Sequence, residues 1–177
     1  ADFYIPVVAR RLGERWVDDS LEFTEVSVAM ANLQTMLHAL DASWCMPERA
    51  PFGTMGEICI IVPDGVQHSI GASILSGQMR RAGYDVRLAN GIKLDDIAAF
   101  VSSPATMGVM LSASLWEPLD FLRVVVKKVR QGNPWAPVLV GGNILERDVD
   151  VCASIGADLA TNDWQTALEF CADRVQP

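Results

Sequence analysis

Residues 57–71 read Glu-Ile-Cys-Ile-Ile-Val-Pro-Asp-Gly-Val-Gln-His-Ser-Ile-Gly and join an apolar run to a polar loop. The continuous apolar run predicts a buried strand of a parallel sheet, whose loop leaves from the carboxyl edge where open α/β folds bind ligands. His68 lies on that loop and is one of only two histidines in the chain. A neutral imidazole at a binding edge indicates a metal or cofactor ligand, since histidine is the commonest protein ligand of transition metals. A histidine that only caps the helix beginning near Ser69 is the alternative that this stretch leaves open.

Beyond this stretch, short apolar runs alternate with helical patterns as far as residue 174. The apolar runs fall at 57–62, 84–89, 106–112, 137–141 and 157–160. The helical patterns fall at 70–82, 93–102, 117–131, 145–154 and 163–174. Five such units predict an α/β domain over residues 57–177, with a flavodoxin-like doubly wound five-stranded parallel sheet.

A short helical cap is expected before this domain. Residues 2–18 and 21–40 carry apolar side chains at helical spacing, and Ser20 is the predicted N-cap of the second helix. Two helices alone cannot bury both of their apolar faces, so residues 1–41 must pack on the sheet domain or on further helices. Residues 42–56 are rich in Pro and Gly without periodicity and predict a linker.

Half of the 177 residues are apolar, which suffices for one substantial core. No apolar run is long enough to span a membrane and no signal-peptide pattern precedes the first helix, so we expect a soluble, cytoplasmic protein. Because the chain begins at Ala1 rather than Met, we also expect a fragment of a longer protein. The formal net charge is −8 without a Lys/Arg cluster. This segment is therefore not expected to bind nucleic acid directly, and a role in gene control would act through a protein partner.

Small and polar residues follow three of the predicted strands. The first strand leads into the loop from Asp64 to Gly71, the third into Ser112-Ala113-Ser114-Leu115, and the fourth into Gly141-Gly142. Parallel strands end at one edge of a sheet, where small residues let a ligand approach the backbone and hydroxyls can hold it. Each element alone is more typical of a turn or a helix cap. Their joint occurrence with His68 predicts a slot for a tail-like ligand.

In this order and at these separations, the three elements resemble the D-x-H-x-x-G, S-x-L and G-G motifs of cobalamin-binding domains, over residues 56–175. The resemblance implies cobalamin as the cofactor, with His68 replacing dimethylbenzimidazole as the lower ligand of cobalt and the nucleotide tail entering a slot. The residues implied to bind the cofactor are His68, Asp64, Gly71, Ser112, Ser114, Leu115, Gly141 and Gly142. The stretch from Ala9 to Trp16, followed by Phe23-Thr24-Glu25, resembles the end of the helical cap of such domains. This likeness implies that Trp16 lies over the upper face of the corrin ring.

More narrowly, the acidic character, the short cap and the helix from Gly71 to Gly83 are similar to the PpaA/AerR antirepressors of photosynthetic bacteria. This similarity implies a light- or redox-responsive sensor that is not an enzyme. The implied partner is a transcriptional repressor of the PpsR/CrtJ type.

Two departures from the family pattern bear on the cobalt ligands. Val66 stands where an aspartate is expected two residues before the histidine, so the carboxylate that orients the imidazole is absent and ligation by His68 should be weaker or differently tuned. Asp64 would replace this carboxylate only if the loop is flexible enough to bring Asp64 to the imidazole. Residues 26–27 are Val-Ser where light-sensing members have a Glu-His pair that places an upper ligand. His38 in the second predicted helix is then a candidate upper ligand, with solvent as the alternative.

Three other functions stay open at this point. A corrinoid carrier of a methyltransferase, or the cobalamin domain of a mutase, would need a substrate domain that this chain lacks, and the missing aspartate also counts against it. A haem-binding sensor would use the same fold with His68 on iron. The remaining alternative is an interaction domain that binds no ligand.

Overall fold

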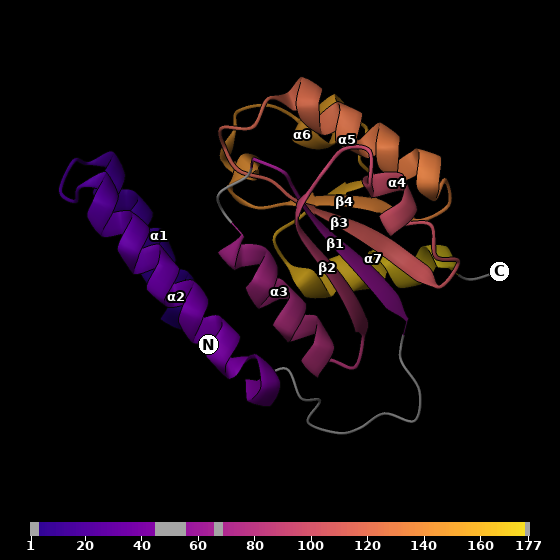
Figure 1. The fold of residues 1–177 in the computed structure, drawn as a ribbon. Helices are drawn as coiled ribbons and strands as arrows, with labels where there is room; N and C mark the ends of the chain where they lie inside the picture. The colour runs from indigo at the N-terminus through magenta and orange to yellow at the C-terminus, as the bar shows by residue number, and fades with distance from the viewer. Residues whose placement is uncertain (1–3, 45–55, 66–68, 176–177) are drawn as a thin grey trace.

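The computed structural model describes residues 4–44, 56–65 and 69–175. Within them, parallel strands form one sheet in the order β2-β1-β3-β4-β5, which confirms the predicted doubly wound α/β fold (Figure 1). The strands are β1 (Glu57–Pro63), β2 (Asp85–Ile92), β3 (Thr106–Ser112), β4 (Val138–Gly141) and β5 (Leu159–Ala160). The helices are α1 (Tyr4–Val17), α2 (Phe23–Trp44), α3 (Ile70–Arg81), α4 (Ile97–Phe100), α5 (Leu119–Gly132), α6 (Val151–Ile155), α7 (Trp164–Val175) and the 3-10 helix η1 (Asn143–Glu146). Val66, His68 and residues 45–55 of the predicted linker lie outside the described residues.

The side chains of β1 alternate between two apolar layers. Ile58, Ile60 and Val62 belong to the core shared with α3 and α7. Cys59 and Ile61 belong to the core shared with α4, α5 and α6, and all five side chains are fully buried. Figure 1 shows the two groups of helices on opposite faces of the sheet. A strand covered on both faces must be apolar at every position, which explains the unbroken apolar run of β1.

The helices α1 and α2 form a hairpin that packs on the outer side of α3 (Figure 1). Ile5, Leu33 and Leu37 of the hairpin meet Ile70 and Ile74 of α3 in a third, smaller apolar cluster. The hairpin thus rests on the first turns of α3, the helix that follows the predicted ligand loop. Among the described helices, none combines the length and hydropathy that a membrane span requires.

The start of α2 differs from the prediction that Ser20 is its N-cap. The Ser20 hydroxyl donates instead to the carbonyl of Arg15 at 3.0 Å, at the end of α1. The helix begins at Phe23, and the Glu25 carboxylate accepts from the backbone N–H of Glu22 at 2.9 Å, as in half of a capping box. The serine signal was wrong because the last carbonyls of α1 also need a donor, and Ser20 supplies it there.

Two other predicted helices are shorter than expected. Of residues 93–102 only α4 is helical, and residues 145–154 hold the end of η1 and most of α6, separated by residues 147–150. The Asp150 carboxylate accepts from the backbone N–H of Ala153 at 3.0 Å and starts α6 as a new N-cap. The buried residues of η1 and α6 lie at helical spacing, so the sequence pattern predicted one continuous helix where there are two.

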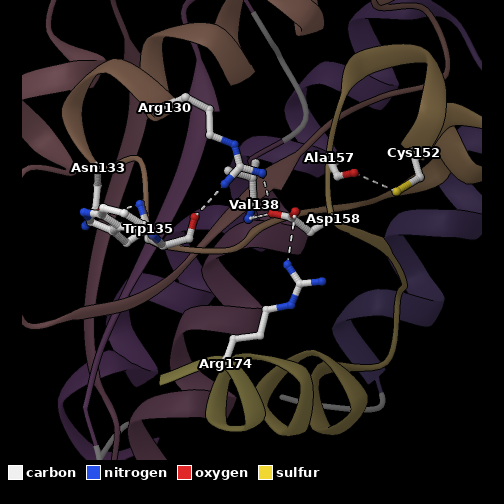
Figure 2. Close-up of polar contacts among 9 residues, drawn as sticks. Arg130, Asn133, Trp135, Val138, Cys152, Ala157, Asp158 and Arg174 are labelled. Carbon is white, nitrogen blue, oxygen red and sulfur yellow. Dashed lines mark hydrogen bonds and ion pairs between the residues drawn. The ribbon is translucent and has the colours of Figure 1, made fainter. Parts of the chain in front are cut away.

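Asp158, just before β5, ties together segments that meet at the start of β4 (Figure 2). Its Oδ2 accepts from the backbone N–H of Val138 at 2.7 Å and from Arg130 at 2.5 Å, and its Oδ1 accepts from Arg174 at 3.3 Å. Burial raises the pKa of this carboxyl, but the Val138 N–H and the Arg130 guanidinium outweigh burial and hold the pKa below its ordinary value of 3.8. The carboxylate therefore helps to set β5 beside β4, with α5 and α7 in place.

We expect Asp158→Asn to lower the free energy of unfolding by about 2 kcal/mol at neutral pH, because two guanidinium groups lose their charged partner. The pKa of Asp158 is depressed in the folded state, so its contribution is fully present above the ordinary pKa and is lost as the pH falls through the folded value. Urea unfolding of both proteins at neutral pH and at steps below pH 3.8 should show a difference that shrinks with falling pH. A difference that stays constant across this range would contradict the role of the charge.

Candidate cofactor site at the carboxyl edge of the sheet

The predicted Ser and Gly elements meet at the carboxyl edge of the sheet. Ser112, the last residue of β3, pairs in register with Gly141, the last residue of β4. The backbone N–H of Ala113 donates to the Gly141 carbonyl at 2.9 Å. Two elements almost 30 residues apart in sequence are thus brought side by side by strand pairing, as the order of parallel strands requires.

Gly142 adopts a backbone conformation that only glycine reaches without strain. Its φ is +106° and its ψ is −176°, and a Cβ at this position would stand 2.2 Å from the carbonyl oxygen of Ala113. The space that Gly142 leaves is therefore filled by the backbone after β3. The glycine allows the loops after β3 and β4 to approach each other closely and so shapes the edge.

The two predicted serine hydroxyls have different surroundings. Ser114 is buried, and its hydroxyl donates to Oε1 of Glu117 at 2.6 Å while its backbone N–H donates to Oε2 at 2.8 Å. Ser112 is half-buried, and no hydrogen bond joins its hydroxyl to another of the described residues. The Ser114 proton is thus already committed to Glu117, whereas the Ser112 hydroxyl keeps both donor and acceptor capacity for a ligand.

Side chains that the sequence interpretation missed hold these loops together. The backbone N–H of Leu115, a predicted site residue, donates to Oδ1 of Asn143 at 2.9 Å. The amide of Asn162, just after β5, makes two bonds to the backbone of Gly142. Ser114 and Glu117 fit the S-x-x-E pattern of a capping box, which would have pointed to Glu117. The two asparagines follow strands, where asparagine is common in any turn, so no comparable signal marks them.

The loop after β1 contributes Asp64 and, past the undescribed residues, Gly71. Asp64 is exposed, and its Oδ1 accepts from the backbone N–H of Gly65 at 3.0 Å, so the carboxylate faces its own loop. A Cβ added at Gly71 in the first turn of α3 would meet no atom within 4 Å among the described residues. Gly71 is exposed, and the predicted roles of Gly71 and Ser112 toward the tail of a cofactor stay predictions. The role of His68 stays a prediction, because residues 66–68 lie outside the described part of the chain.

Trp16 lies near the end of α1, at the closed end of the helical hairpin. Trp16 is 43% exposed, and its ring centroid stands 6.4 Å from that of Phe23 at the start of α2. Figure 1 shows this end of the hairpin on the side of the molecule toward which β1 runs. The structure brings Trp16 together with Phe23 and does not test its predicted place over a cofactor.

Comparisons with known proteins agree with this fold. The model of the B12 binding domain family matches residues 56–168, which include β1 to β5 and every strand-end element described above. The chain is 29% identical over 169 residues to an uncharacterized 20.5 kDa protein in the bchF-crtJ intergenic region of Rhodobacter capsulatus, covering 95% of this chain and 88% of that protein. A crystal structure of a cobalamin-binding protein from Desulfitobacterium hafniense superposes with a TM-score of 0.55 at 21% identity, covering 97% of this chain and 82% of that one, which supports the fold. The family match spans well over half of the chain, and the chain therefore belongs to the B12 binding domain family.

Proposed function

We propose that the chain binds a cobalamin at the carboxyl edge of its sheet and works as a sensor rather than as an enzyme. His68 is the proposed lower ligand of cobalt. Ser112 would hold the nucleotide tail through its uncommitted hydroxyl, and Gly71 would leave room for the tail beside α3. A bound cobalamin would supply a cobalt ion whose ligands exchange under light or a change of redox state.

The observation that carries the sensing role is the contact between the ligand loop and the helical hairpin. Ser69 directly follows His68, and its hydroxyl accepts from the Gln34 side chain of α2 at 3.2 Å. Next to it, Ile70 packs against the apolar residues of the hairpin. A displacement of the loop that carries the cobalt ligand is therefore transmitted to α2 through direct contacts, which is the kind of local event that biases a two-state packing.

The proposed output is a protein partner that binds the hairpin. Several large apolar side chains of the hairpin are exposed, and an apolar surface of this kind is typical of an interaction site. They are Tyr4, Val8, Phe23, Val28 and Met36. The Rhodobacter relative belongs to the bchF-crtJ intergenic region, which supports a transcriptional repressor of the PpsR/CrtJ type as the partner. The net charge of −8 favours action through such a partner over direct contact with DNA.

Reconstitution tests the binding step. The purified chain is incubated with hydroxocobalamin, with hemin, or with neither, and is separated from free ligand by gel filtration before its visible spectrum is recorded. We expect corrin absorption to elute with the protein. A Soret band after hemin without retention of hydroxocobalamin would show the haem sensor instead, and no retained colour would refute both.

Gln34→Ala tests the coupling. We expect cobalamin affinity to change by less than about twofold, because Gln34 contacts the loop from outside the slot, while the effect of light or reductant on repressor binding falls at least about fivefold. The measurement is repressor affinity by calorimetry, in darkness and after illumination, with and without hydroxocobalamin. Asn32→Ala on the same helix is the matched control. An unchanged light effect in Gln34→Ala would contradict transmission through Ser69.

A further inference from the structure

We propose that Asn162 is a positioning residue for the nucleotide tail of the cofactor, an inference that rests on the proposed cobalamin site. The side-chain oxygen of Asn162 accepts from the backbone N–H of Gly142 at 2.6 Å. Its side-chain nitrogen donates to the carbonyl of the same residue at 3.3 Å. The side-chain amide of Asn162 thus bonds both the N–H and the carbonyl of Gly142, as the backbone of a neighbouring strand would.

Gly142 needs these hydrogen bonds to hold its conformation. Gly142 has a φ of +106° and stands beyond the last pair of β4, so regular strand pairing does not fix its conformation. Glycine can adopt many backbone conformations, so contacts from the surrounding residues must select this one. Ala113, Leu145 and Asn162 contact Gly142, and Asn162 makes two hydrogen bonds to its backbone.

The position of Gly142 in turn sets the loop that carries the serines. The Ala113 carbonyl is the nearest neighbour of Gly142, and it accepts from the backbone N–H of Ile144 at 3.4 Å. Two residues after Ala113, the backbone N–H of Leu115 donates to the side chain of Asn143. Without the two hydrogen bonds from Asn162, residues 142–144 can shift, and the backbone of residues 113–115 shifts with them. Ser112 and Ser114 flank Ala113, so their hydroxyls lose their fixed places.

This chain of contacts acts on the β3–β4–β5 side of the edge. In the sheet order, β1, which precedes His68 in the sequence, lies on the far side of β3 from Asn162. Loss of the Asn162 amide should therefore disturb the slot of the tail more than the ligation of cobalt. A corrinoid that lacks the nucleotide tail separates the two effects, and cobinamide is such a compound.

The chain also offers a matched control at the opposite edge. The amide of Asn133 makes four bonds to the backbone, donating to Val101 and Ser103 at 3.3 Å and accepting from Trp135 at 3.3 Å and Ala136 at 3.1 Å (Figure 2 shows Asn133 and Trp135). It fixes a loop before β4, on the amino side of the strands. Asn133→Ala thus removes more side-chain hydrogen bonds than Asn162→Ala without touching the proposed slot.

The experiment measures the affinities of hydroxocobalamin and cobinamide for the wild type, Asn162→Ala, Asn162→Asp and Asn133→Ala. We expect Asn162→Ala to weaken cobalamin at least about tenfold and cobinamide less than about twofold. Asn162→Asp keeps the acceptor for the Gly142 N–H and should lose less affinity, and Asn133→Ala should leave the ratio of the two affinities unchanged. Hydrogen exchange of the Gly142 amide without ligand should be faster in Asn162→Ala than in the wild type.

The outcomes separate this inference from the proposed function. A wild type that binds neither corrinoid refutes the cobalamin site itself. If the wild type binds cobalamin and Asn162→Ala binds it equally well, the site stands and the positioning role is wrong. Equal weakening of cobalamin and cobinamide, or an unchanged Gly142 exchange rate, would likewise show that Asn162 does not act through the tail slot.

Discussion

Gly142→Ala is expected to lower the free energy of unfolding by about 4 kcal/mol and to abolish retention of hydroxocobalamin. The reason is twofold. A non-glycine residue at φ +106° is strained, and the new Cβ would stand 2.2 Å from a backbone oxygen that cannot rotate away. Relief requires that the loops after β3 and β4 separate, and that separation displaces Ser112 and Ser114. Urea unfolding measures the stability, and gel filtration with hydroxocobalamin measures the binding.

Gly156→Ala is the matched control for this change. Gly156 also has a positive φ, +78°, but a Cβ there would meet no described atom within 4 Å. Strain without overlap should cost about 1 kcal/mol, and cobalamin binding should persist because the residue ends α6, away from the strand-end loops. Equal destabilisation by both substitutions, or normal cobalamin binding by Gly142→Ala, would show that close packing at Gly142 does not shape the site.

His68→Ala should weaken hydroxocobalamin binding by at least about tenfold and change the visible spectrum of any cobalamin that stays bound, because an axial nitrogen ligand of cobalt is lost. Gel filtration and visible spectra of both proteins with hydroxocobalamin check this expectation.

The other histidine of the chain provides the comparison. His38→Ala should leave the tightness of binding and the spectrum attributable to the lower ligand unchanged. A spectrum altered only by His38→Ala would reassign the cobalt ligand to α2. A spectrum altered by both substitutions would show histidine on both faces of the corrin ring.

The sheet could be predicted closely because its strands are buried on both faces. β3 begins and ends where its apolar run does, at residues 106 and 112. The edge strand β2 instead continues past its predicted end at residue 89 to Ile92, through Asn90 and Gly91. An edge strand is only partly covered, so its end can be polar and still pair. An apolar sequence pattern indicates which residues are buried. It does not reveal the end of a strand whose backbone pairing continues through exposed residues.

The meeting of the strand-end elements at the carboxyl edge could be predicted from the sequence, but the hydrogen bonds among their loops could not. Strand order alone places the Ser112 and Gly141 elements together, since parallel strands share one carboxyl edge. The engagement of Ser114 by Glu117 and of Gly142 by Asn162 depends on side-chain geometry between loops, which has no periodic signature in the sequence. The separate start of α6 was missed for a related reason, because apolar spacing does not reveal where a capping aspartate such as Asp150 begins a new helix.

The hydrogen bonds from Asn162 to Gly142 also have a consequence for the synthesis of the protein. A chain emerging from the ribosome carries the serine and glycine elements well before it carries the asparagine that fixes them. Truncated or still-growing chains that stop before residue 162 therefore contain every strand-end residue proposed to touch the tail, yet lack the part that holds those residues in place. Loading of the cofactor should then be a late event in maturation, completed only when the last strand and α7 have docked.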